Sequence, residues 1–221
     1  EKSKVLLCSK KIKPENGVYL EDNCIYIAEN GVSRPLMMKD KIRILGEHNV
    51  SNVMMAAAIV QGLCKDEDIV YVAENFGGVE HRIEFVRELN GVKYYNDSIA
   101  SSPTRTIAGL CSFNQKLILI AGGYDKHIPY DVLGEPICEH VSKLIVTGAT
   151  ANKIKECVKN AKNSEKPEIF DADSLAHAVK KASEIAQSGD IVIMSPASAS
   201  FDAFKNFMER GEMFKNLVIT L

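Results

Sequence analysis

After about residue 80, short apolar runs alternate regularly with longer stretches of helical spacing. Runs at 116–120, 143–147, 167–170 and 190–194 predict buried strands, and helices are predicted over 103–111, 130–140, 151–160 and 174–187. Asp173 and Gly189 suggest the start and end of the last of these helices. Strands that alternate with helices are typical of a mostly parallel sheet with both faces covered. Residues 80–221 are therefore predicted to form one Rossmann-like α/β domain that opens with a hairpin, 83–89 and 92–96 around Asn90-Gly91.

The pattern before residue 80 is less regular. Strand-like pieces at 5–8, 17–20 and 24–27 lie between turn residues, and helices are predicted over 53–63 and 66–75. Asn49 or Ser51 is a candidate cap of the first helix. These elements do not make a complete doubly wound sheet. Residues 1–79 are therefore predicted to be the back portion of a larger α/β domain, and 80–221 a second domain.

The last quarter of the chain combines a strand, small residues and a helix. The strand at 190–194 ends at Ser195-Pro196, and a helix is predicted from near Ser200, with apolar Phe204, Phe207 and Phe214 at helical spacing. Unpaired N–H groups and the dipole of a helix N-terminus attract anions, and serine hydroxyls add donors. This segment therefore predicts an anion-binding site.

Composition excludes several classes of protein. Lys and Arg number 27 against 29 Asp and Glu, so the net charge is −2, which gives no electrostatic footprint for nucleic acid. The longest apolar run, 53–60, is far shorter than the roughly 20 residues that cross a membrane. The six cysteines are far apart and form no CxxC pair, which opposes a zinc site and predicts reduced, mostly buried thiols of a cytoplasmic protein. The first residue, Glu1, suggests a fragment or a processed chain.

Three polar segments follow strands of the predicted sheet: 96–98, 122–126 and 195–200. Ligands of open α/β sheets lie beyond the carboxyl ends of the strands, so one cleft is expected to hold an acid, a lysine and several serines. Such a set suits a phosphorylated or carboxylated substrate. The pair Gly122-Gly123 lacks the GxGxxG pattern of a dinucleotide site, so a tight turn is favoured over nicotinamide binding.

Each candidate residue also has a structural explanation. Arg82 suits either an ion pair at the domain boundary or a clamp on phosphate. Asp97 suits a turn cap, Lys126 a solvated loop and Phe207 the core. The scattered histidines have no ligand spacing, and no metal site is predicted from them.

Five motifs occur in an order that resembles the Mur ligases. The resemblance covers about residues 46–218, and its last motif is similar to that of the member that adds D-glutamate to UDP-N-acetylmuramoyl-L-alanine. The motifs are His48-Asn49-x-x-Asn52, Glu80-His81-Arg82, Asn96-Asp97-Ser98, Gly122-Gly123-x-x-Lys126, and Ser195 to Ser200 followed by Phe201-Asp202-x-Phe204-Lys205-Asn206-Phe207 and Arg210-Gly211.

The resemblance implies roles for these residues. ATP would be contacted by Asn49, Asn52, Arg82 and Asp97. D-glutamate would be held by Ser101, Lys126, Ser200 and Phe207, with Lys126 and Ser200 at its carboxylates and Lys126 as the catalytic candidate. Ile99 stands where many relatives have lysine, so a cationic contact there must be absent or supplied elsewhere.

The resemblance also implies a reaction. With ATP and Mg²⁺, the alanine carboxylate of UDP-N-acetylmuramoyl-L-alanine would become an acyl phosphate, which the amine of D-glutamate attacks. The phosphate-binding pattern GxxxxGK[ST] does not occur in the 221 residues. In this family that loop and most metal ligands precede the matched region. The chain is therefore expected to be the C-terminal part of a monomeric, cytoplasmic enzyme, and to be inactive by itself.

Three other interpretations stay open. A sibling Mur ligase or folylpolyglutamate synthase would share the order of motifs. The missing phosphate loop favours a non-catalytic α/β binding module. A nicotinamide-dependent dehydrogenase is the third alternative.

Overall fold

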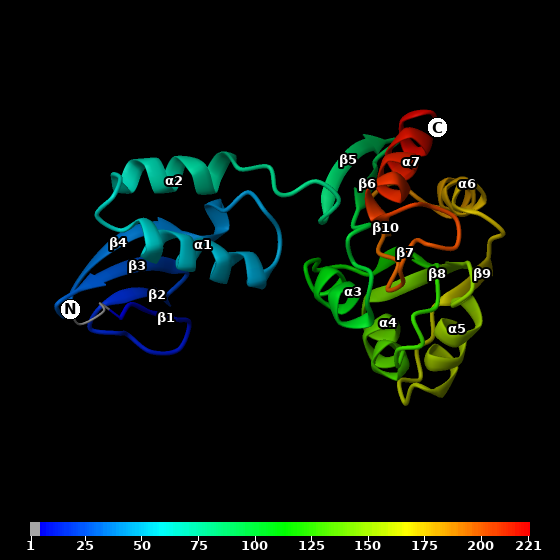
Figure 1. The fold of residues 1–221 in the computed structure, drawn as a ribbon, viewed down its shortest axis with the longest axis horizontal. Coiled ribbons are helices and arrows are strands. Elements are labelled where there is room, and N and C mark those ends of the chain that lie inside the picture. Colours follow the sequence, from blue (N-terminus) through cyan, green and yellow to red (C-terminus); the bar gives the residue numbers. More distant parts are fainter. Residues whose placement is uncertain (1–4) are drawn as a thin grey trace. The chain divides into compact units, whose positions relative to one another are not determined.

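The computed structural model describes residues 5–221, and the contacts of these residues divide them into two compact units, 5–78 and 79–221. The first unit is a four-stranded sheet covered by two helices (Figure 1). Its strands β1 to β4 are hydrogen-bonded in chain order, with β1 parallel to β2 and the other pairs antiparallel. The elements are β1 (Leu7–Ser9), β2 (Gly17–Glu21), β3 (Cys24–Glu29), β4 (Val32–Met38), a 3₁₀ turn (Lys39–Lys41), α1 (Glu47–Val60) and α2 (Asp66–Asn75).

Strand β4 has no counterpart among the predicted elements. It lies at the edge of the sheet and most of its side chains are exposed, so it carries no alternation of apolar and polar residues. It also contains Pro35, which is tolerated at a sheet edge and otherwise argues against a strand.

Helix α1 begins six residues earlier than predicted. Gly46, with φ 100°, precedes it, so Asn49 and Ser51 lie inside the helix and the prediction that either caps it is wrong. The Asn49 side chain instead donates to the Leu45 carbonyl at 2.7 Å, which ties the first turn to the preceding loop. Helix α2 has the predicted bounds.

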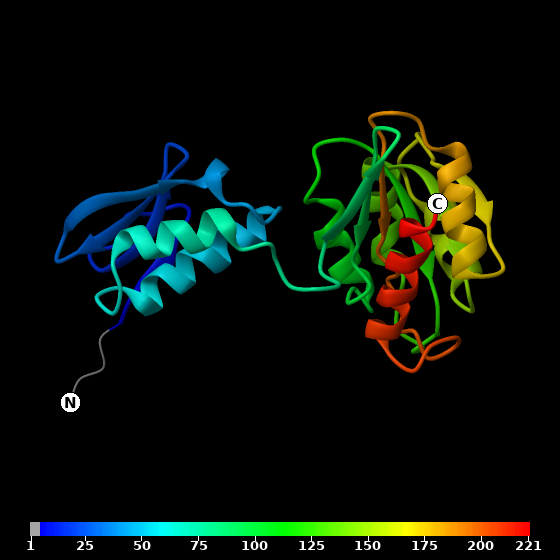
Figure 2. The same ribbon diagram turned by 90° about the horizontal axis from the view of Figure 1, so that it is seen from above.

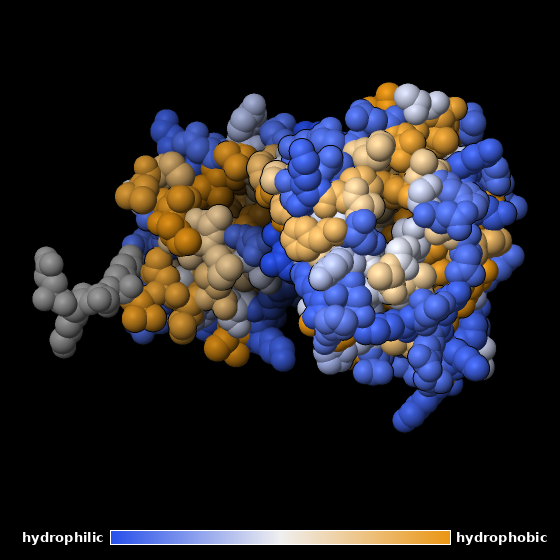
Figure 3. Space-filling view, turned by 45° about the vertical axis from the view of Figure 1, so that its right-hand side comes forward, coloured by the Kyte–Doolittle hydropathy of each residue, from blue (hydrophilic) through white to orange (hydrophobic). Residues whose placement is uncertain are grey.

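The helices of the first unit leave a large apolar surface exposed. An open groove of about 430 Å³ runs between α1 and α2, and exposed apolar side chains lie on both helices. Ile59 is 74% exposed and Tyr71 is 68% exposed. Figure 3 shows hydrophobic side chains gathered on one face of this unit. Contiguous apolar surface of this kind is typical of an interaction face.

The second unit confirms the predicted mostly parallel α/β fold. Its six strands are ordered β5-β6-β10-β7-β8-β9, and only the pair β5–β6 is antiparallel. Asn90 and Gly91 both have positive φ, 53° and 78°, as a two-residue hairpin turn requires. The strands are β5 (Glu84–Leu89), β6 (Val92–Asn96), β7 (Leu117–Gly122), β8 (Val141–Thr147), β9 (Glu168–Asp171) and β10 (Ile191–Met194).

Helices cover both faces of this sheet. On one face lie α3 (Pro103–Leu110), a 3₁₀ turn (Asp131–Leu133), α4 (Gly134–His140) and α5 (Ala151–Asn160), and on the other lie α6 (Leu175–Ile185) and α7 (Phe207–Ile219) (Figure 1). Figure 2, seen from the side of α6 and α7, shows these two helices over the strands. Each layer buries its own apolar cluster against the sheet, Leu133 and Ile154 on one side and Val179 and Phe214 on the other.

Two predicted helix starts are wrong. Ser174 rather than Asp173 caps α6, because its Oγ accepts from His177 N at 3.2 Å. Helix α7 begins at Phe207 rather than near Ser200, and residues 200–206 form turns in which Ser200 O accepts from Phe204 N. The cap of α7 is Asn206, whose Oδ1 accepts from Glu209 N at 2.9 Å. The spacing Asn206-x-x-Glu209 resembles a capping box and is the signal that marks this start.

All six cysteines are free, as predicted. The expectation that most are buried is wrong, because only Cys138 is buried, and Cys8, Cys64 and Cys111 are exposed. Within residues 5–221 no helix combines the length and the apolar character needed to cross a membrane.

Phe214 tests the packing of α7 on the sheet. Its side chain is fully buried in the cluster of the α6–α7 layer, so Phe214→Ala should lower the free energy of unfolding by about 3–5 kcal/mol. Urea denaturation followed by circular dichroism measures this change. Asn216→Ala, an exposed position on the same helix, is the matched control and should change stability by less than about 0.5 kcal/mol. Equal effects of the two substitutions would contradict the packing described here.

Candidate functional site

The three polar segments meet at the carboxyl ends of β6, β7 and β10. Asp97 N donates to Met194 O at 2.9 Å, which joins the end of β6 to the end of β10. Gly122 N donates to Pro196 O at 2.8 Å and Tyr124 N to Ala199 O at 2.9 Å. The segment 195–200 therefore runs between the other two, and all six of its residues are buried.

The glycine pair permits a close crossing of chains. Gly122 and Gly123 have φ 118° and 144°, and a Cβ on either would collide with backbone, of Thr147 and of Ala199 respectively. Both requirements are met by glycine alone. The pair therefore lets the end of β7 approach the backbone of the 195–200 segment closely. A tight turn at this pair is what the sequence favours.

Lys126 and Ser101, two of the residues predicted to hold D-glutamate, lie together. Lys126 Nζ donates to Ser101 O at 3.1 Å, although the two residues follow different strands. The neighbouring Asp125 is engaged elsewhere, since it pairs with Lys153 at 2.6 Å, and this bond lowers the pKa of Asp125 below its usual range. Lys126 itself is exposed, so its ammonium is open to solvent.

Ser198 anchors the centre of the 195–200 segment. Its Oγ lies 2.9 Å from Tyr130 Oη and 2.8 Å from Thr150 Oγ1. Thr150 Oγ1 also accepts from Gly123 N at 3.1 Å. This buried network joins the segment to the glycine crossing. Tyr130 and Thr150 could not be predicted as members of this network, because each lies near the start of a helix far along the chain from Ser198.

Ser200 and Phe207 are the next two candidate residues. Ser200 is the first residue of the turns at 200–206, and Phe207 directly follows them. Ser200 is 2% exposed, and Phe207 is half-buried with its ring edge-to-face against His81, the centroids 5.9 Å apart. His81 is itself buried, and its Nδ1 accepts from Asn96 Nδ2 at 2.9 Å. A Cβ at Gly211 would collide with the His81 ring, so glycine in α7 allows this packing.

Asp97 is a buried carboxyl at the end of β6. Its Oδ2 accepts from Ser195 Oγ at 2.7 Å and its Oδ1 from Ile83 N at 3.3 Å. Burial raises the pKa of Asp97 to about 7, although the Ser195 bond and the charges of Arg82 and Arg105 favour the ionised form. The two arginines therefore lie near enough to act on this carboxyl, and Arg82 is exposed.

The other nucleotide candidates belong to the first unit. Asn49 is buried, and its Oδ1 accepts from Asn52 Nδ2 at 3.0 Å, so the two side chains form one pair on α1. Asn52 is exposed. The four predicted nucleotide contacts are thus distributed over two units, Asn49 and Asn52 in one, Arg82 and Asp97 in the other.

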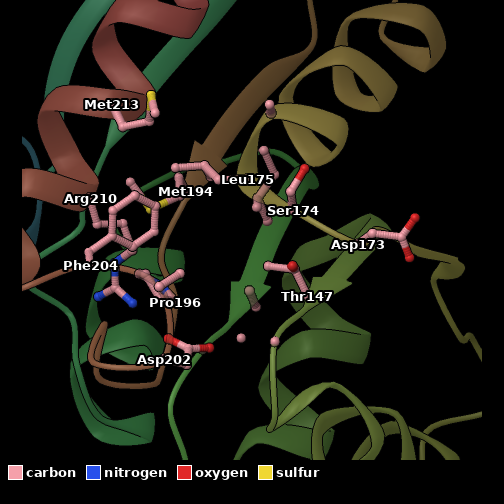
Figure 4. A pocket seen from close by; sticks show the side chains of 17 residues that line it. Thr147, Asp173, Ser174, Leu175, Met194, Pro196, Asp202, Phe204, Arg210 and Met213 are labelled. Carbon is pink, nitrogen blue, oxygen red and sulfur yellow. The ribbon is translucent and has the colours of Figure 1, made fainter.

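A cavity of about 340 Å³ lies beside the 195–200 segment, between the ends of β7 and β8 and the first turn of α6 (Figure 4). Figure 4 shows Arg210 and Phe204 on one side of it, Asp173 and Ser174 on the other. Neither Lys126 nor Ser200 lines this cavity. The helix N-terminus expected at Ser200 is not found there, because α7 begins at Phe207, and the helix start that lines this cavity is that of α6.

The residues described here do not fit the Mg²⁺ implied by the family resemblance. Ligand atoms of Glu80, His81 and Glu212 lie within 4.8 Å of one another. The Lys215 ammonium already occupies that cluster, since it pairs with Glu80 and with Glu212 at 2.6 Å. The cluster is an ion-pair network built on a lysine.

The pH dependence of stability tests the burial of Asp97. Because its folded pKa is about 7 against a usual value of 3.8, the folded chain binds more protons than the unfolded chain between those values. The free energy of unfolding should therefore fall as pH rises through this window, by up to about 1.4 kcal/mol per pH unit from this group. Asp97→Asn should remove that slope in urea denaturation between pH 5 and pH 8, whereas Asp173→Asn, at an exposed position, should retain it. An unchanged slope in Asp97→Asn would contradict the assignment.

Comparison with known proteins places these residues in a family. Residues 81–198 match the family described as Mur ligase, glutamate ligase domain. The chain is 52% identical, over 98% of its length, to the UDP-N-acetylmuramoylalanine–D-glutamate ligase of Acetivibrio thermocellus, and 50% identical to that of Clostridium acetobutylicum. It covers 47% of each of these proteins, so it spans about half the length of the curated relatives it matches.

Solved structures share the fold at low sequence identity. The UDP-N-acetylmuramate–alanine ligase of Thermotoga maritima matches 92% of this chain and 46% of its own with a TM-score of 0.64 and 15% identity. Folylpolyglutamate synthase of the same organism matches 94% of this chain and 46% of its own with a TM-score of 0.56 and 16% identity. Taken with the matched domain and the relatives at about half identity, these findings show that the chain belongs to the Mur ligase family.

Proposed function

We propose that this chain is the C-terminal part of an ATP-dependent ligase that adds D-glutamate to UDP-N-acetylmuramoyl-L-alanine during peptidoglycan synthesis. The observation that carries the proposal is the identity of about 50%, over nearly the whole chain, to relatives named as D-glutamate ligases. The site supports it, since an ammonium and several hydroxyl groups surround the strand ends where an acidic amino acid would bind.

The D-glutamate site would be built on the second unit, 80–221. Lys126 and Ser101 lie side by side, and Lys126 Nζ would neutralise one carboxylate of the acceptor. Ser200 would donate to the other carboxylate, and Phe207 would close the site from the start of α7. In the reaction the amine of D-glutamate attacks the acyl phosphate of the UDP-sugar substrate and phosphate leaves. Lys126, as the catalytic candidate, would offset charge that develops near this step.

Four residues would contact the nucleotide, as the family resemblance implies. Asn49 and Asn52 would act from α1, and Arg82 and Asp97 from the start of the second unit. Residues 1–79 would then belong to the central ATP-binding domain of the whole enzyme. The apolar groove between α1 and α2 supports this assignment, because it would be covered where the domain is complete. We further propose that the enzyme is a monomer and works in the cytoplasm.

The choice of acceptor tests the proposal most simply. The uninterrupted parent enzyme, given ATP, magnesium and UDP-N-acetylmuramoyl-L-alanine, should release phosphate with D-glutamate and not with L-glutamate, L-alanine or L-lysine. The 221-residue chain should release none, because GxxxxGK[ST] does not occur in it. Release with another acceptor would assign the chain to a sibling ligase, no release with any would favour a binding module, and turnover by the 221-residue chain would refute its predicted inactivity.

A charge-removing substitution tests the role of Lys126. Lys126→Met keeps the length of the side chain and should raise the KM for D-glutamate about 10- to 100-fold, the effect of losing a charged hydrogen bond. Steady-state phosphate release by the parent enzyme measures it, with the KM for ATP as the internal reference. Lys116→Met is the matched control. Lys116 lies just before the amino end of β7, at the other edge of the sheet from the site, and pairs with Glu165 at 2.8 Å. An unchanged KM for D-glutamate in Lys126→Met would refute the assignment.

A further inference from the structure

Arg210 is a buried cation whose hydrogen-bonding capacity is fully used. It lies in the first turn of α7, is 4% exposed, and makes five hydrogen bonds of 2.9–3.1 Å. A guanidinium has five N–H donors in a rigid planar fork, so each of them has an acceptor here. All five acceptors are neutral oxygens, and the Asp202 carboxylate acts on this cation through its charge.

The five bonds join two loops that are far apart in the sequence. Nε and Nη2 donate to Oγ and O of Ser98, which follows β6. Nη1 donates to O of Ser198 and of Ala199, and Nη2 also donates to Ser198 O. The guanidinium therefore fixes the backbone immediately before Ser200. Figure 4 shows it reaching down from α7 beside Phe204 toward Pro196.

One of the acceptors extends this control to Phe207. Ser98 Oγ accepts from Arg210 Nε and donates its own proton to Phe207 O at 2.7 Å. Phe207 is the first residue of α7, so this bond ties the start of the helix to the loop after β6. The Arg210 side chain thus holds the backbone before Ser200 directly, and it holds the backbone at Phe207 through Ser98.

We propose that Arg210 is a positioning residue for D-glutamate, one that holds Ser200 and Phe207 in place through the loop carbonyls and Ser98 without touching the substrate. This inference rests on the proposed function. Burial lowers the pKa of Arg210 to about 10, so the cation remains charged at neutral pH but is held there at a cost in desolvation. The complete set of bonds offsets this cost, and the negative charge of Asp202 acts in the same direction. A lysine at this position has three donors in place of five and could not span both loops.

Arg210→Lys in the parent enzyme tests the proposal, because it keeps the charge and removes the fork. The KM for D-glutamate should rise about tenfold or more, since small displacements of positioning groups have effects of this size, while the KM values for ATP and for the UDP-sugar stay within about twofold. Phe214→Leu is the matched control. It weakens the packing of the same helix and should lower thermal stability without changing the KM for D-glutamate.

Ser98→Ala is the second variant, and it decides the matter if Arg210→Lys does not fold. It removes the acceptor of Arg210 Nε and the donor to Phe207 O, so it should also raise the KM for D-glutamate selectively. A native KM for D-glutamate in the folded variants, or an equal rise for all three substrates, would overturn the positioning role. Failure of the parent enzyme with Arg210 intact to use D-glutamate would instead overturn the proposed function, and this inference with it.

Discussion

The second unit depends on the way the segment 195–200 is held between the ends of β6 and β7. Its six residues are buried, so its polar backbone and side-chain groups need partners inside the protein. Ser195 bonds to Asp97, Ser198 to Thr150 and Tyr130, and the carbonyls at 198 and 199 accept from Arg210. Ala197 has a φ of 56°, a strained value for a residue with a Cβ, which persists where the surroundings determine it. The rest of the site follows from this arrangement.

The partners of this segment form two polar networks, which attach it to different elements of the fold. One, around Ser198 and the glycine crossing, fixes the segment to β7 and β8. The other, around Arg210 and Ser98, fixes it to β6 and to the start of α7. The exposed Lys126 belongs to neither network and donates to Ser101 O. The side chains proposed to meet D-glutamate are thus separate from those of the two networks.

Much of this fold could be predicted from the order of apolar and polar residues. The strands of the second unit and its hairpin follow from local patterns, and so does the meeting of three polar segments, because parallel strands share one carboxyl edge. The start of α7 could not be placed by periodicity, since Phe204 continues the helical spacing although it lies in a turn and packs against the core. Arg210 belongs to the last motif, but neither its role nor that of Tyr130 could be predicted, because a charged or aromatic residue within a helical pattern is ordinarily assigned to a surface or a core. Their contacts arise from tertiary structure alone.

D-glutamate is proposed to bind beside the 195–200 segment, and a crystal structure of the parent enzyme with D-glutamate and a non-hydrolysable ATP analogue would show whether it does. We expect the two carboxylates of D-glutamate to lie within hydrogen-bond distance of Lys126 Nζ and Ser200 Oγ, with the Arg210 guanidinium bonded to the loops and not to the ligand. D-glutamate bound in the cavity at the start of α6 would rule out the proposed binding place, and a direct contact with Arg210 would rule out its role as a positioning residue.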